Sequence, residues 1–308
     1  MKNRMAAIVF VAASMGTALS WAVPASAAPQ AGDPAEAPSP NGLAVSPPTF
    51  DLVARPGEVV HRTVKLQNLS DMPRTVDVSA RNFTAKGEEG QADLTSDPTT
   101  FAMANWVSVA PSQVQVAPKS EESFDFSVSL PANAEPGGHY GAVVFRSATA
   151  PPVAGAVNVA QEVASLILLR VPGEVREAAH VATFTATPQS ISSGPVHFEA
   201  RVANSGNVHV HPTGSVRITD LFGKTVATIP VPGANVLPSS VRRFDVTWKG
   251  GQLLGRYKAT LTMSFGDSKQ RVSRGATFIG FPVAGAVIAV VVLIGLVLLV
   301  LRRRRSAR

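Results

Sequence analysis

The chain of 308 residues contains no cysteine. A disulfide framework is therefore impossible, and cysteine nucleophiles and thiolate metal sites are excluded. Tyrosine is scarce, with two residues in the whole chain, and no charged residue occurs from Gly275 to Leu301. Hydrophobic residues make up 45% of the sequence. A sizeable core can therefore form, and packing together with backbone hydrogen bonds must stabilise it.

Excess basic charge is confined to the two ends of the chain. The formal net charge is +7 and the isoelectric point is about 10.1. Seven of the 28 Lys and Arg residues lie in the first four or the last seven positions, and the remaining 21 equal the 21 Asp and Glu residues. Because the part between is formally neutral, the basic charge forms no phosphate-binding face, and we expect no nucleic-acid partner.

The N-terminus has the three parts of a secretory signal. Lys2 and Arg4 precede an apolar run, Met5–Leu19, and small residues follow at Ala25-Ser26-Ala27. This pattern predicts a signal peptide over 1–27, with an uncleaved anchor as the alternative. Residues 28–42 are rich in Pro and Ala, which predicts a disordered leader.

The C-terminus carries a long apolar run. Residues 281–301 are almost all Val, Leu, Ile, Ala or Gly, and a block of arginines follows. A helix of this length would span roughly 31 Å, close to the hydrocarbon core of about 30 Å. The pattern predicts a transmembrane helix over 281–301 and a basic cytoplasmic tail over 302–308. It also predicts a single-pass protein of the cell membrane, with the N-terminal bulk extracytoplasmic.

Short segments of alternating apolar and polar residues fill the chain between these ends. In the clearest, Ser123–Leu130, the residues Phe124, Phe126, Val128 and Leu130 share one face. Pro, Gly, Asn and Asp separate the segments, and Val163–Val171 reads as a central strand buried on both faces. Strands at this spacing are typical of antiparallel sandwiches. We predict an all-β fold with two tandem immunoglobulin-like β-sandwiches, over 43–173 and 174–279, plus one C-terminal transmembrane α-helix.

The two halves resemble each other. Phe124-Asp125-Phe126 matches Phe244-Asp245-Val246, and the two tyrosines, Tyr140 and Tyr257, follow at nearly the same offset. Asn68 and Asn204 also correspond. A tyrosine near the start of a late strand, bonded back to the backbone, is the tyrosine corner of such sandwiches. We therefore predict structural roles for Tyr140, Tyr257, Asn68 and Asn204.

No catalytic motif occurs in the sequence: there is no nucleophile elbow, P-loop, dinucleotide fingerprint or zinc-protease signature. We expect no enzyme and no cofactor. His209 and His211 share one face of a strand and are weak candidates for metal ligands, although an exposed polar strand face is favoured. Trp106 has two readings, as a core residue or as an exposed aromatic that faces a ligand.

Three segments stand out: Val45-Ser46-Pro47-Pro48-Thr49-Phe50-Asp51-Leu52, Pro136-Gly137-Gly138-His139-Tyr140-Gly141-Ala142-Val143-Val144-Phe145 and Asn204-Ser205-Gly206-Asn207-Val208-His209. In these segments the chain resembles the WxL-interacting protein family of bacterial cell surfaces. The resemblance covers roughly residues 43 to 280. It implies a first domain similar to ones that bind peptidoglycan and a second domain that engages a secreted partner protein.

Three functions remain open from the sequence. The main interpretation is a non-catalytic, membrane-anchored scaffold that binds the cell wall, a secreted surface protein, or both. The alternative is a chaperone-like assembly factor of the periplasm or cell surface that uses a free sheet edge. A cell-wall-active hydrolase is the remote alternative, since two carboxylates across a cleft cannot be recognised from sequence. No small-molecule cofactor is implied by any of these.

Overall fold

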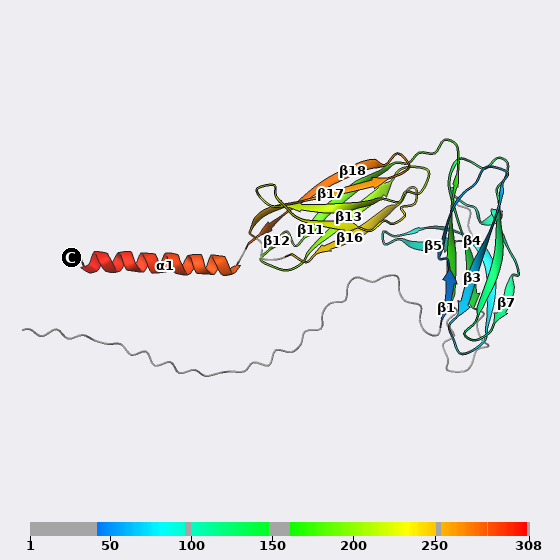
Figure 1. The fold of residues 1–308 in the computed structure, drawn as a ribbon, viewed down its shortest axis with the longest axis horizontal. Coiled ribbons are helices and arrows are strands. Elements are labelled where there is room, and N and C mark those ends of the chain that lie inside the picture. Colours follow the sequence, from blue (N-terminus) through cyan, green and yellow to red (C-terminus); the bar gives the residue numbers. More distant parts are fainter. Residues whose placement is uncertain (1–41, 96–99, 148–160, 251–253, 282, 307–308) are drawn as a thin grey trace, which may run out of the picture. The chain divides into compact units, whose positions relative to one another are not determined.

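The computed structural model describes residues 42–95, 100–147, 161–250, 254–281 and 283–306. The predicted signal peptide, 1–27, and all but the last residue of the predicted leader, 28–42, lie outside the described residues. Apart from one turn of 3-10 helix and the C-terminal helix α1, the regular structure of the described chain consists of strands (Figure 1). The all-β class is therefore confirmed, and the arrangement is consistent with immunoglobulin-like sandwiches.

The first sandwich is formed by strands β1 to β10. One sheet has the order β1-β3-β8-β6, with bounds β1 (Leu43–Ser46), β3 (Val59–Asn68), β8 (Glu121–Ser129) and β6 (Val107–Val109). The other has the order β2-β10-β9-β4-β5, and β7 also pairs with β4. Its bounds are β2 (Thr49–Val53), β10 (Glu162–Val171), β9 (Gly137–Ser147), β4 (Arg74–Lys86), β5 (Gln91–Thr95) and β7 (Gln113–Val116).

The second sandwich is formed by strands β11 to β18. Its smaller sheet has the order β11-β13-β16, with bounds β11 (Ala179–Thr187), β13 (Val196–Asn204) and β16 (Val241–Trp248). Its larger sheet has the order β12-β18-β17-β14-β15. The bounds are β12 (Ser190–Ile191), β18 (Gln270–Gly280), β17 (Gly255–Phe265), β14 (Thr213–Thr219) and β15 (Thr225–Val231). The named strands of one sandwich pair with none of the other; the exact domain limits at 173 and 174 stay a prediction.

Each sandwich has its own hydrophobic core. Val64, Phe126 and Phe145 are fully buried in the first core, and Phe198, Leu261 and Phe278 are fully buried in the second. These side chains occupy alternate positions of their strands, as a sheet with one buried face requires. The alternating pattern therefore located the cores correctly.

Strand β9 departs from this alternation because it is buried on both faces. Ten of its 11 residues are buried, Arg146 being the exception. Val143 and Phe145 point into the first core, whereas Tyr140, Ala142 and Val144 belong to a third apolar cluster on the outer face of the same sheet. Phe83 from β4 and Leu168 from β10 join this cluster, which positions the site described below.

The two asparagines hold the same turn in each sandwich. The backbone N–H of Asn68 donates to Ser120 O at 2.9 Å, and that of Asn204 to Ser240 O at 3.0 Å. Each side-chain amide donates to at least two backbone carbonyls: Met72 and Val116 for Asn68, at 2.9 and 3.2 Å, and Val208 and Val236 for Asn204, at 2.8 and 2.9 Å. Both side chains are buried, so each satisfies backbone groups that would otherwise be unpaired.

The predicted transmembrane helix is wrong. Helix α1 runs from Val283 to Ser306, beyond the predicted limits of 281–301 and into the arginine run. Within the part of the chain that the structure describes, no helix is both long and apolar enough to cross a membrane. The single-pass membrane location, with a cytoplasmic tail at 302–308, is therefore overturned.

Two phenylalanines of the second sandwich give a direct test of the core. Phe198 is 1% exposed and Phe222, in the turn between β14 and β15, is 91% exposed. We expect Phe198→Ala to lower the free energy of unfolding by about 3–5 kcal/mol. Phe222→Ala should change it by less than about 0.5 kcal/mol. Urea denaturation of both variants measures this, and equal effects would contradict the assigned core.

Candidate functional site: a groove bordered by strand edges

Tyr140 makes a contact that the repeat pattern did not predict. Its hydroxyl accepts a hydrogen bond from the backbone N–H of His209, in the second sandwich, at 2.7 Å. It does not bond back to the strand that carries it, as the tyrosine corner requires. Burial raises the pKa of the Tyr140 phenol, which therefore stays protonated. Tyr257 bonds locally instead, because its hydroxyl accepts from the N–H of Leu254 at 3.3 Å.

The two candidate metal ligands have different partners. The ring of His209 is 8% exposed, and its Nε2 lies 3.5 Å from a carboxylate oxygen of Asp51. The ring of His211 lines the groove described below, and its Nδ1 is 2.8 Å from Oδ1 of Asn235. Among the described residues no three His, Asp or Glu side chains form a group that could hold a metal ion. The structure thus supplies no third ligand for this pair.

Trp106 lies in a 3-10 turn, Ala104–Trp106, directly before β6. Its half-buried ring packs against the first core and lies 4.5 Å, centroid to centroid, from the ring of His139. One face of the Trp106 ring is thus covered by residues of its own sandwich. It is absent from the residues that line the groove.

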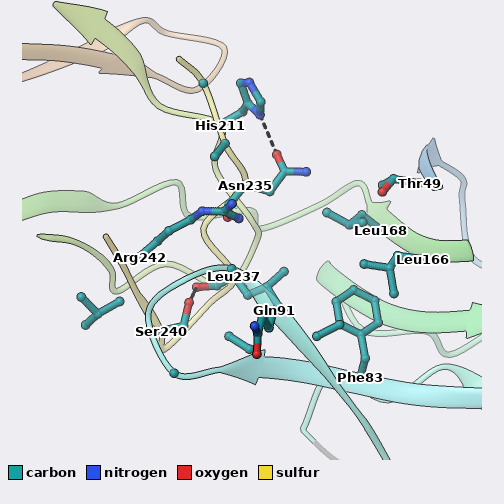
Figure 2. A pocket seen from close by; sticks show the side chains of 17 residues that line it. Thr49, Phe83, Gln91, Leu166, Leu168, His211, Asn235, Leu237, Ser240 and Arg242 are labelled. Carbon is teal, nitrogen blue, oxygen red and sulfur yellow. Dashed lines mark hydrogen bonds between the residues drawn. The ribbon is translucent and has the colours of Figure 1, made fainter. Parts of the chain in front are cut away.

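The groove is a cavity of about 350 Å³. Figure 2 shows Phe83, Leu166 and Leu168 on one side of it and Arg242, Asn235 and His211 on the other. The apolar side chains belong to the third cluster, on the outer face of the β9 sheet, and Leu237 of the second sandwich packs against the same cluster. An apolar wall thus faces a polar one across a space of ligand size.

Three edge strands border this groove. Thr49 begins β2, Gln91 begins β5, and Val241 begins β16, and all three residues line the cavity. In the described ladders β2 pairs only with β10, β5 only with β4, and β16 only with β13. Each therefore has one edge without a strand partner, and such edges present backbone N–H and C=O groups to an added strand.

The turn between β4 and β5 reaches the edge of β16. The N–H of Arg243 donates to the carbonyl oxygen of Glu88 at 2.7 Å. The Glu88 carboxylate accepts from Nε of Arg201 at 2.6 Å, and Glu89 accepts from Arg243 at 3.0 Å. The Arg201 hydrogen bond holds the pKa of Glu88 below its usual range. No local sequence pattern predicts these contacts, because the partners of Glu88 and Glu89 lie more than 100 residues away.

Arg242 is the cation that faces the cavity. One guanidinium N–H donates to the carbonyl oxygen of Asn235 at 2.9 Å. The guanidinium lies against Gly90, where an added Cβ would overlap its Cζ. Burial lowers the pKa of Arg242, and no carboxylate of the described residues lies within 4 Å of it. The hydroxyl of Ser240 donates to Leu237 O, so the lining shows no nucleophile and base in contact.

Comparisons with known proteins leave the family open. No protein-family model matches the sequence, and no curated protein matches it. Solved structures match weakly, among them a class 5 fimbriae chaperone, CfaA, at 12% identity and a TM-score of 0.41, with 76% of this chain and 99% of that chain covered. The CupB2 chaperone of Pseudomonas aeruginosa matches at 14% identity and 0.37, with 77% and 100% covered. The YadV chaperone matches at 12% identity and 0.38, with 77% and 99% covered. Likenesses at this level carry no conclusion about function, and the resemblance to WxL-interacting proteins stays a prediction.

The contact between Tyr140 and His209 predicts a pH dependence of stability. Burial lowers the pKa of His209 below its usual 6.5, and the Asp51 carboxylate opposes this only in part. The unfolded state therefore binds the proton more readily. The free energy of unfolding should fall as pH decreases from 6.5 towards the lowered pKa and then level off. Arg170 and His211 also face this ring and disfavour its protonation.

Urea denaturation between pH 8 and 4.5 measures this slope. His209→Gln should flatten it, whereas substitution of the exposed His61 by Gln is the matched control and should not. Tyr140→Phe should lower stability by about 1–3 kcal/mol at all these pH values, because it leaves the buried N–H of His209 without its acceptor. An unchanged slope in His209→Gln would contradict the buried neutral histidine.

Proposed function

We propose that the chain is a non-catalytic binding protein that holds an extended segment of another protein in the groove, as a chaperone-like assembly factor does. The observation that supports this proposal most directly is the border of three strand edges around one apolar cavity. An extended segment needs backbone partners along its length and pockets for its alternate side chains. The edges of β2, β5 and β16 offer the first, and the third apolar cluster offers the second.

The size and chemistry of the groove favour a segment over a folded surface. About 350 Å³ is at the lower end of ligand-pocket volumes and holds a few side chains. Burying one Val or Leu side chain against Phe83 and Leu168 would contribute about 1.5–3 kcal/mol. Each backbone hydrogen bond to a strand edge adds about 1 kcal/mol. A few such contacts give reversible binding, which suits transient holding of a partner.

The wall-binding interpretation competes with this proposal. A glycan is recognised through many polar groups, whereas the side of the groove formed by Phe83, Leu166 and Leu168 is apolar. The described structure gives the wall-binding interpretation no feature of its own. One binding experiment with two probes can therefore decide between the two interpretations.

The experiment uses the full chain and two probes, α-lactalbumin kept unfolded by reduction and alkylation, and purified peptidoglycan sacculi. We expect the unfolded chain to bind and the sacculi not to sediment the protein. The N–H of Arg243 points away from β13 towards Glu88, so the N–H of Asp245, two residues on, also lies on the free edge. Asp245→Pro removes that donor without breaking the β13 ladder.

Asp245→Pro should weaken binding of the unfolded chain about fivefold or more, because a proline blocks the added strand. Asp245→Ala, which removes the same carboxylate but keeps the N–H, is the matched control and should retain most of the affinity. Binding to sacculi without binding to the unfolded chain would replace the proposal by the wall scaffold. Equal binding by Asp245→Pro and Asp245→Ala would show that the segment does not add to the edge of β16.

A further inference from the structure

We infer that Arg242 forms a carboxylate subsite in the groove, and that the segment held there carries an acidic side chain flanked by apolar residues. This inference rests on the proposed function and names the class of segment that the groove takes. It follows from three features of the cavity: an arginine without a carboxylate, a glycine that leaves room for the guanidinium, and the apolar wall opposite.

Three arginines of the second sandwich gather near the turn between β4 and β5, and they differ in their partners. Arg201 is paired with Glu88, and Arg243 is paired with Glu89 and Asp245. Among the described residues, the acceptor of Arg242 is the neutral carbonyl of Asn235. The local carboxylates are therefore used by its neighbours, and among the described residues none remains within ion-pair distance of Arg242.

A half-buried cation without a counter-ion is unfavourable unless a ligand supplies one. Apart from His211, Arg242 is the one ionisable side chain of the lining, since Gln91, Asn235, Ser240 and Thr49 carry no charge. A guanidinium presents five N–H donors in a planar fork that matches a carboxylate. One donor is used by Asn235, so the others are available to an anionic oxygen that enters the groove.

The guanidinium is oriented by its hydrogen bond to Asn235 and occupies space that Gly90 leaves open. It lies beside Gly90, whose φ of +80° is a conformation that favours glycine. A Cβ at this position would overlap the guanidinium and displace it. A cation that is already oriented loses little conformational freedom on binding, which favours a specific ion pair.

The surroundings favour a side chain as the source of the carboxylate. Arg242 is the second residue of β16, close to the part of the free edge that the segment would use at Asp245, since the N–H of Arg243 already donates to Glu88. A segment that passes Arg242 presents side chains there, with alternate residues on opposite faces. Phe83, Leu166 and Leu168 stand across the cavity, as Figure 2 shows, so apolar neighbours of the acidic residue have a surface to pack against.

The test uses three libraries of acetylated octapeptides, randomised among Val, Leu, Thr and Ser. The first carries one central Glu and a C-terminal amide. The second has Gln in place of Glu and a C-terminal amide. The third has the same Gln and a free C-terminal carboxylate. The bound fraction of each library on the immobilised full chain is measured at low and high salt.

We expect the Glu library to bind about tenfold more strongly than the Gln amide library, with the difference reduced by salt. Arg242→Gln should abolish this preference, and Arg242→Lys should retain part of it. Arg217→Gln, an exposed arginine of β14 outside the groove, is the matched control and should bind as the unchanged chain does. Gly90→Ala keeps the charge but displaces the guanidinium, so it should reduce the preference.

Each other outcome overturns a defined part of the account. Equal binding of the Glu and Gln amide libraries overturns the carboxylate subsite and leaves the proposed function standing. If only the library with a free C-terminal carboxylate is enriched, the carboxylate bound by Arg242 does not come from an acidic side chain. Binding of no library overturns the proposed function as well. Thermal unfolding of Arg242→Gln, compared with Arg217→Gln, verifies that a lost preference does not come from misfolding.

Discussion

Much of this structure depends on one constraint, the burial of β9 on both of its faces. A strand in a two-layer sandwich normally buries one face and exposes the other. Here Val143 and Phe145 fill the core, while Tyr140 and Val144 point outwards and still require cover. The hairpin of β4 and β5 and residue Leu237 of the second sandwich supply part of that cover. The groove is the part of this apolar face that these elements leave open.

The same constraint explains where polar groups occur. Tyr140 carries a hydroxyl into the apolar cluster, and the N–H of His209 satisfies it. Glu88 and Glu89 hold the hairpin turn against arginines of β13 and β16. These pairs neutralise the charges around the groove and leave Arg242 as the exception. A partner segment would thus cover the open part of the apolar face and pair with the Arg242 cation.

The sequence predicted the local structure well and the site poorly. Alternation along Ser123–Leu130 depends on neighbouring residues, so this strand and its buried face could be read directly. The short strands β1, β5 and β12 have two to five residues each, too few for an alternating pattern to identify them. The contact of Tyr140 with His209 spans 69 residues and that of Glu88 with Arg201 spans 113. No local pattern encodes either contact. The position of Arg242 beside Gly90 likewise cannot be read from the local sequence.

The central claim is that an extended segment adds to the strand edges that border the groove. Hydrogen–deuterium exchange of the full chain, with and without the unfolded α-lactalbumin probe, tests it most directly. The account predicts slower exchange of the amides in Gln91–Thr95 and Val241–Trp248 on binding, with exchange in β13 and β17 unchanged. Protection confined to strands remote from the groove, such as β12 and β15, would contradict it.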